Sequence, residues 1–161
     1  MRWCDGLTDA TAPRSVNRWL SMRVIAQTRA YDVANPIDVR RDWAAVSIKL
    51  TECAARFAGY GSWNEAIDIC NMRAFMIRNL SPVPVSEVDA LIAFALARLT
   101  LRPSAAKALA DRWQTLPVDR ILLLRRHKNL IAPLVHLADQ LPDTADADIA
   151  RSWINIHRHL P

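Results

Sequence analysis

The sequence predicts an all-α protein of antiparallel helical hairpins, packed as a bundle or a short solenoid of about seven to eight helices. Three observations favour this class. Alanine, leucine and arginine are abundant, whereas the 161 residues include only 3 glycines. Apolar residues recur at helical spacing along most of the chain, and prolines mark the breaks between these segments. We therefore expect almost no strand and a single helical domain over 1–161.

The first expected helix follows an irregular lead-in, 1–13, that shows no clear period. The helix extends from Pro13 to about Ala34, where Asn35-Pro36 ends it, because a proline disfavours helix in the residue before it. Its expected buried stripe is Val16, Trp19, Leu20 and Val24.

The clearest predicted element is a helical hairpin over 38–80. Gly59 and Gly61 allow the backbone angles of a tight helix exit, and Ser62 with Glu65 forms a capping box that starts the second helix. Apolar residues fall on one face of the first helix, namely Trp43, Val46, Leu50, Cys53 and Phe57. The expected buried face of the second helix is Trp63, Ala66, Ile67, Cys70, Ala74 and Ile77.

A second hairpin is predicted over 86–115, after the extended break at Ser81-Pro82-Val83-Pro84. Ser86 is expected to cap its first helix, and Pro103-Ser104 to open its second helix, in which Trp113 packs. The first of these helices has an almost wholly apolar body, formed by Val88, Leu91, Ile92, Ala95, Leu96 and Leu99.

The C-terminal helices occupy 118–161. One is expected from Val118 to Ile131, with Ile121, Leu122 and Leu124 inside, and Pro133 kinks or ends it. The last helix begins near Asp143 and Thr144, where acidic residues favour a helix start. Its inward-facing residues are predicted to be Ile149, Trp153, Ile156 and Leu160.

The composition limits the expected cellular location of the protein and the kind of partner it binds. The longest apolar run, 90–97, is far shorter than the roughly 20 residues of a membrane span. The N-terminal residues lack the apolar segment of a secretory signal, and the odd number of cysteines fits free thiols. We therefore expect a cytoplasmic protein. The net charge of +5 comes mainly from scattered arginines, which by themselves do not indicate a phosphate-bearing partner.

No catalytic signature occurs in the sequence. Cys53 and Cys70 fall on apolar faces without an activating neighbour, and no glycine-rich phosphate cradle is present. His157 and His159 point to different sides of a helix, and the aspartates of 143–148 lack the pattern of a calcium loop. We expect neither an enzyme nor a bound metal or cofactor.

The segment Gly61-Ser62-Trp63-Asn64-Glu65-Ala66-Ile67 resembles the start of the second helix of a tetratricopeptide repeat. That family repeats a glycine, a large aromatic residue two positions on and a Glu-Ala-Ile-like triplet. Ala54 takes the place of the family's small residue in the first helix, and Pro82 lies a few residues beyond its repeat-ending proline. A looser copy, 87–113, places Ala106 40 positions after Ala66, instead of the usual ~34, and lacks the turn glycine.

The run 91–113 is also similar to the second hairpin of the small tetratricopeptide-like chaperones of bacterial type III secretion, which hold a secreted needle or translocator subunit. The resemblance implies a chaperone or assembly adaptor that holds an amphipathic helix or a secreted subunit. Trp3 and Trp19 are candidates for exposed anchors, because their neighbours are polar or basic, and core packing is the alternative for both. The predicted partner-binding residues are Trp19, Arg56, Tyr60, Arg73, Arg120, Arg125, Arg126 and Lys128.

Two other functions stay open. Residues 105–128 have the outline of a helix-turn-helix, with a basic cluster from Arg120 to Lys128 that includes His127, which would suit a DNA-binding regulator. Against it, the apolar run 121–124 stands where base-reading side chains would be expected, and the cluster could be a solvated face neutralised by the nearby aspartates. Alternatively, a surplus apolar face could close a homodimer of a self-associating structural protein.

Overall fold

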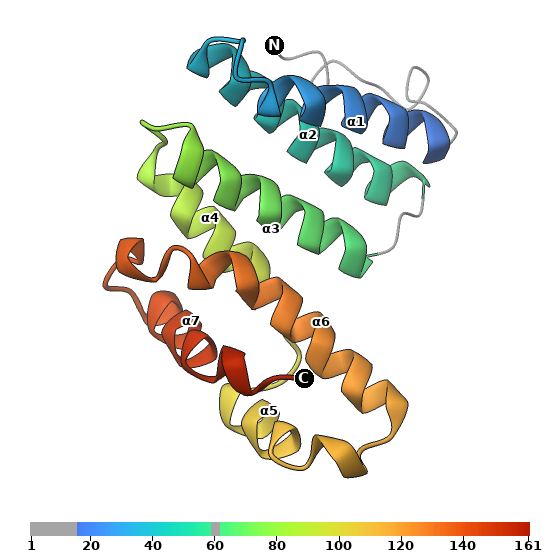
Figure 1. Ribbon diagram of the computed structural model, residues 1–161, viewed down its shortest axis with the longest axis vertical. Coiled ribbons are helices and arrows are strands. Elements are labelled where there is room, and N and C mark those ends of the chain that lie inside the picture. Colours follow the sequence, from blue (N-terminus) through green and yellow to red (C-terminus); the bar gives the residue numbers. More distant parts are fainter. Residues whose placement is uncertain (1–15, 59–61) are drawn as a thin grey trace. The chain divides into compact units, whose positions relative to one another are not determined.

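The computed structural model describes residues 16–58 and 62–161 of the chain. In these residues, seven α-helices and three short 3-10 helices follow one another without a strand (Figure 1). The all-α class predicted from the sequence is thereby confirmed. The chain divides into two compact units, 1–83 and 84–161, at the proline-rich break.

Several sequence predictions lie outside the described residues. They concern the lead-in 1–13 with Trp3, the turn from Gly59 to Gly61 with Tyr60, and the side chains of Phe57 and Ser62.

The first unit contains α1 (Val16–Tyr31), α2 (Ile37–Ala58) and α3 (Ser62–Asn79). α2 packs against both α1 and α3, and each of these neighbours runs antiparallel to it (Figure 1). The predicted buried face of α2 is confirmed at Val46, Leu50 and Cys53. Trp43 is half-buried at the edge of this core, with the Arg29 guanidinium 4.9 Å from its ring centroid.

The face of α1 that packs on α2 differs from the predicted stripe. Trp19, Ala26 and Ala30 are fully buried, whereas Val24 is 54% exposed. At 3.6 residues per turn, the three buried residues share one face, and Val24 lies about 140° away from it. The prediction that Val24 is buried is therefore wrong. The small alanine side chains, which allow two helices to approach closely, form the contact instead.

α3 is fixed to the other two helices by polar contacts as well as by its apolar face. Ala66, Cys70, Ala74 and Ile77 are buried as predicted. Arg23 of α1 forms an ion pair with Asp68 of α3. Nε of Arg41, near the start of α2, donates a 2.8 Å hydrogen bond to the carbonyl of Leu80, directly after α3.

The second unit contains α4 (Val85–Leu96), α5 (Pro103–Ala110), α6 (Val118–Val135) and α7 (Ala145–Ile156). Short 3-10 helices cover Trp113–Thr115, Ala138–Gln140 and His157–His159. α7 packs against α4, α5 and α6, so it is the central helix of this unit. The core of the second unit includes Leu91, Ala95, Leu124, Leu130, Ile131, Leu134, Ala150 and Trp153.

Three side chains of this unit that were expected inside are exposed, so these predictions are wrong. Trp113 is 41% exposed, because α5 ends at Ala110 and the tryptophan begins a separate 3-10 helix. Leu122 is 44% exposed, since it lies about 160° around α6 from the buried Leu124 and about 140° from the buried His127. Ile149 is 45% exposed on the side of α7 that faces α5.

The predicted helix start agrees with the structure at α7 but not at α4. The hydroxyl of Thr144 accepts a 3.2 Å hydrogen bond from the N–H of Ala147, which confirms the predicted start of α7. Ser86 does not cap α4, because the helix already begins at Val85, with Pro84 before it and no side-chain cap. α6 continues through the buried Pro133 and ends two residues later, at Val135.

Candidate protein-binding surface on α6

The predicted anchor Trp19 is not available for binding. It is fully buried between α1 and α2, so the prediction of an exposed anchor is wrong. Arg18, the residue before Trp19, is exposed on another side of α1. In the same unit, Arg56 is exposed near the end of α2, and Arg73 is half-buried on α3.

The four predicted cations of α6 do not share one face. Nζ of Lys128 donates a 2.8 Å hydrogen bond to the carbonyl of Leu160, so this side chain holds the C-terminal residues. Arg120 is exposed but lies about 140° around the helix from Arg125. Arg125 and Arg126 are exposed and flank the outer side of the helix at Leu122.

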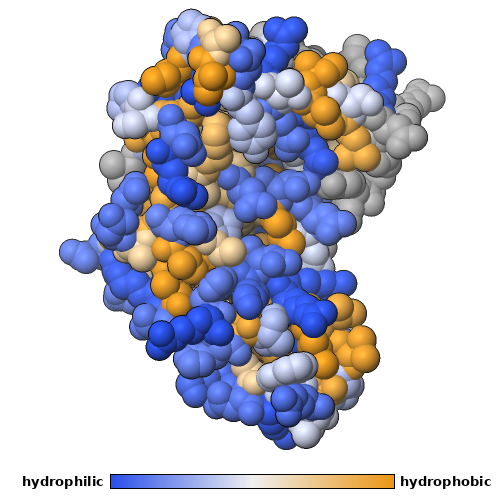
Figure 2. Space-filling view, viewed as in Figure 1, coloured by the Kyte–Doolittle hydropathy of each residue, from blue (hydrophilic) through white to orange (hydrophobic). Residues whose placement is uncertain are grey.

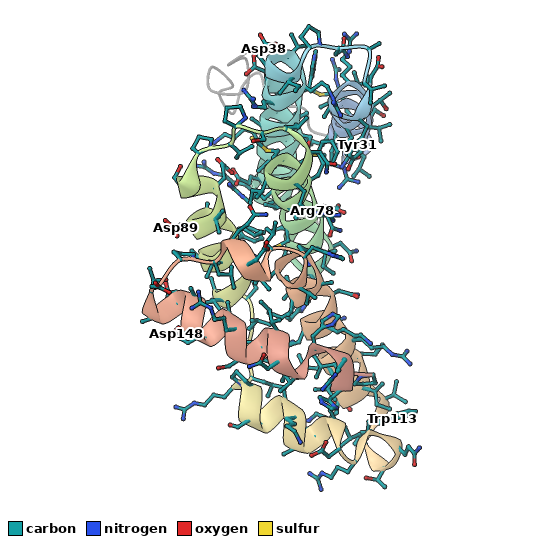
Figure 3. The ribbon with its side chains drawn as sticks, turned by 60° about the vertical axis from the view of Figure 1, so that its left-hand side comes forward. Tyr31, Asp38, Arg78, Asp89, Trp113 and Asp148 are labelled. Atoms are coloured by element: carbon teal, nitrogen blue, oxygen red, sulfur yellow. The ribbon has the colours of Figure 1, made fainter. Side chains whose placement is uncertain are left out.

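Large apolar side chains lie next to these two arginines. Val118, one turn before Leu122, is 71% exposed. The surface that we name the α6 face consists of Trp113, Val118, Leu122, Arg125 and Arg126, of which Trp113 lies in the 3-10 helix before α6. Figure 2 shows a hydrophobic area over the first part of α6, bordered by hydrophilic side chains. Figure 3 shows Trp113 at the connection between α5 and α6, on the opposite side of the unit from Asp148 of α7.

His127 belongs to the opposite, buried face of α6 and not to the basic cluster in which the sequence placed it. Its side chain is fully buried. Nε2 accepts hydrogen bonds from the backbone N–H groups of Thr100, at 3.0 Å, and Leu101, at 3.3 Å. An accepting Nε2 assigns the ring proton to Nδ1, on the side of the Leu123 carbonyl. Burial lowers the pKa of His127, so the ring is neutral at pH 7.

The neutral histidine fixes the rotation of α6. Its ring contacts that of Trp153 of α7, with centroids 5.4 Å apart, and its two hydrogen bonds hold the α4–α5 connection. With this side anchored, the α6 face is turned away from the core. A sequence signal for this burial existed, because Leu124, His127, Leu130 and Leu134 recur at helical spacing.

The described part of the chain shows neither a metal-ligand cluster nor a membrane-spanning helix. In 16–58 and 62–161, no three His, Cys, Asp or Glu side chains gather closely enough to hold a metal ion. Within the same ranges, no helix combines the length and hydrophobicity that crossing a membrane requires. Comparison with protein-family models, curated proteins and solved structures finds no match for the chain.

Proposed function

We propose that this protein is a non-enzymatic scaffold that binds a partner protein through the α6 face. The observation that carries the proposal is the exposure of Trp113, Val118 and Leu122 beside Arg125 and Arg126. Exposed apolar patches with a polar border mark interaction sites, and tryptophan and arginine dominate the binding energy of protein interfaces.

The shape and charge of this surface favour an amphipathic, acidic helix as the partner segment. Its apolar stripe would cover Val118 and Leu122, which are one turn apart, and its carboxylates would pair with Arg125 and Arg126 one turn further on. Asp119 is the acidic residue of α6, and it lies about 60° around the helix from Leu122. The surface therefore attracts an anionic partner more than a cationic one.

The role that we propose is that of a chaperone or assembly adaptor in the bacterial cytoplasm. The resemblance of 61–67 to a tetratricopeptide repeat supports this role. The similarity of 91–113 to type III secretion chaperones favours a secreted subunit as the partner.

Affinity capture from the native host, with quantitative mass spectrometry, tests the proposal. The full-length protein should retain one protein in stoichiometric amount, and Leu122→Asp should lose it. Val24→Asp is the matched control, because Val24 is also half-exposed but lies on α1 in the first unit. If both variants retain the partner equally, the α6 face is not its binding site.

The nucleic-acid content of the captured material, salt-dependent DNA binding and sedimentation separate the two other functions. Recovery of nucleic acid without a stoichiometric protein, with binding to duplex DNA that weakens steeply with salt, would favour a DNA-binding regulator. The exposed Val118 and Leu122 speak against this function, since a base-reading helix presents polar side chains to the groove. A dimer in sedimentation that Leu122→Asp dissociates would instead make a second copy the partner.

A further inference from the structure

A groove of about 610 Å³ lies between α5 and α7 in the second unit. These two helices lie side by side in Figure 3. Pro103, Ile149 and Ile156 give the groove an apolar lining, and Arg102 and Lys107 add two cations from the α5 side. The volume is in the range of ligand-binding clefts.

The charged side chains that line the groove, Arg102 and Lys107, are both cations. Of the described residues that line it, none carries a carboxylate, and the remaining polar groups are neutral hydroxyls and an amide. Nζ of Lys107 lies 3.0 Å from Oδ2 of Asp111, outside the groove, in a pair whose two side chains are 50% and 57% exposed. Such an exposed pair is weak, so Lys107 can exchange Asp111 for a carboxylate inside the groove.

The apolar side of the groove limits the length of an occupant. Ile149 and Ile156 lie two turns apart on α7, a separation of roughly 10 Å along the helix. This length matches about three residues of extended chain. Because Ile149 is half-exposed and lines the groove with Arg102 and Lys107, an aliphatic side chain can cover it while neighbouring carboxylates reach these two cations.

We infer that this groove binds a short acidic segment of a partner protein, in which an aliphatic residue stands between two carboxylates. The aliphatic side chain packs on the half-exposed Ile149, and the carboxylates pair with Arg102 and Lys107. The inference rests on the proposed function in one respect, namely that the occupant belongs to a protein. The groove and the α6 face are formed by different side chains, so each can fail without the other.

Fluorescence anisotropy with the full-length protein tests the inference. The probe is a labelled peptide with Asp-Leu-Glu between glycine and serine flanks, and its two controls carry Asn-Leu-Gln or Asp-Ser-Glu in the same flanks. We expect saturable binding of the probe and about tenfold weaker binding of each control, since each removes one kind of contact.

Two matched variants locate the binding. Ile149→Asp should weaken binding of the probe about tenfold or more, whereas Leu122→Asp should leave it unchanged, because the two side chains are equally exposed but only Ile149 lines the groove. Replacement of both cations, by Arg102→Gln with Lys107→Gln, should remove the preference for the acidic peptide. Circular dichroism confirms that each variant is folded.

Several outcomes would overturn the inference. They are the absence of saturable binding of the probe, equal binding of the Asn-Leu-Gln peptide, or an unchanged affinity in Ile149→Asp. A dimer of the wild-type chain that Ile149→Asp dissociates would assign the groove to a second copy. Failure of the peptide with intact partner capture rejects the groove alone. Loss of capture with intact peptide binding rejects the proposed α6 interaction alone.

Discussion

The backbone N–H of Thr100 donates a 3.0 Å hydrogen bond to Nε2 of His127, a side chain with no exposed surface. The N–H of Leu101 shares this acceptor, and Arg102, the next residue, precedes α5 and lines the groove. One neutral imidazole on α6 thus positions the chain segment that leads into a groove wall. Protonation of Nε2 would remove the acceptor from both N–H groups.

The second unit should therefore lose stability at mildly acidic pH. Burial lowers the pKa of His127 below its ordinary value of 6.5. The unfolded chain consequently binds more protons than the folded chain at pH values between the two pKa values. The stabilisation is fully present above pH 6.5 and declines as the pH falls toward the folded-state pKa. Urea unfolding at about pH 7.5 and about pH 5 measures the difference.

The pKa of His157 is lowered as well, so its contribution to the pH dependence of stability has to be separated from that of His127. Burial, Lys128 and His136 lower its pKa, in this order of importance. We expect His127→Gln to reduce the dependence of the unfolding free energy on pH, because the glutamine oxygen accepts a hydrogen bond without titrating. His157→Gln provides the comparison. An unchanged pH dependence in His127→Gln would show that His127 does not control the stability of this unit.

Sequence periodicity predicted the buried face of a helix best where apolar residues stand out clearly from polar neighbours. On α2, Val46, Leu50 and Cys53 stand out from charged neighbours, and their burial was predicted correctly. Alanine gives no such contrast, so the packing of Ala26 and Ala30 could not be read from the stripe on α1, although the buried Trp19 belongs to that stripe.

Similar reasons limited the prediction of the surface sites. The uninterrupted run 121–124 covers most of the circumference of α6, so the pattern did not distinguish the exposed Leu122 from the buried Leu124. The arginines Arg125 and Arg126 were predicted on the exposed face, and they are exposed. The groove brings 102–107 together with 149–156, and helical periodicity carries no information on such distant pairs.

Substitution by alanine should mainly reduce stability at Trp19 and mainly reduce partner binding at Trp113. Trp19→Ala removes a fully buried indole and should lower the free energy of unfolding by about 3–5 kcal/mol. Trp113→Ala removes a side chain that is 41% exposed, so it should cost about 1 kcal/mol or less but weaken capture of the partner. Urea denaturation and affinity capture give the two readouts. Equal destabilisation by both substitutions would contradict the assignment of Trp113 to a binding surface.

Lys128 and Arg125 should likewise separate stability from binding. Lys128→Ala removes the hydrogen bond from Nζ to the Leu160 carbonyl and should destabilise the protein by about 1–3 kcal/mol without weakening partner capture. Arg125→Ala should change stability by less than about 0.5 kcal/mol and reduce capture. Hydrogen exchange near Leu160 should rise in the first variant only. A loss of capture in Lys128→Ala, with a stable fold, would extend the binding surface to Lys128.

Asp111→Asn should strengthen binding of the Asp-Leu-Glu peptide. Oδ2 of Asp111 competes for Nζ of Lys107, 3.0 Å away, with the carboxylate that we place in the groove. An exposed pair contributes about 0.2–1 kcal/mol, so its removal should raise the affinity between about 1.5-fold and about fivefold. Asp119→Asn on α6 changes the net charge equally and should leave the affinity almost unchanged. The gain should vanish in the presence of Lys107→Gln, because the competition acts on Lys107 alone. An equal gain from Asp119→Asn would assign the effect to the overall charge of the protein, and a gain that persists with Lys107→Gln would remove Lys107 from the site.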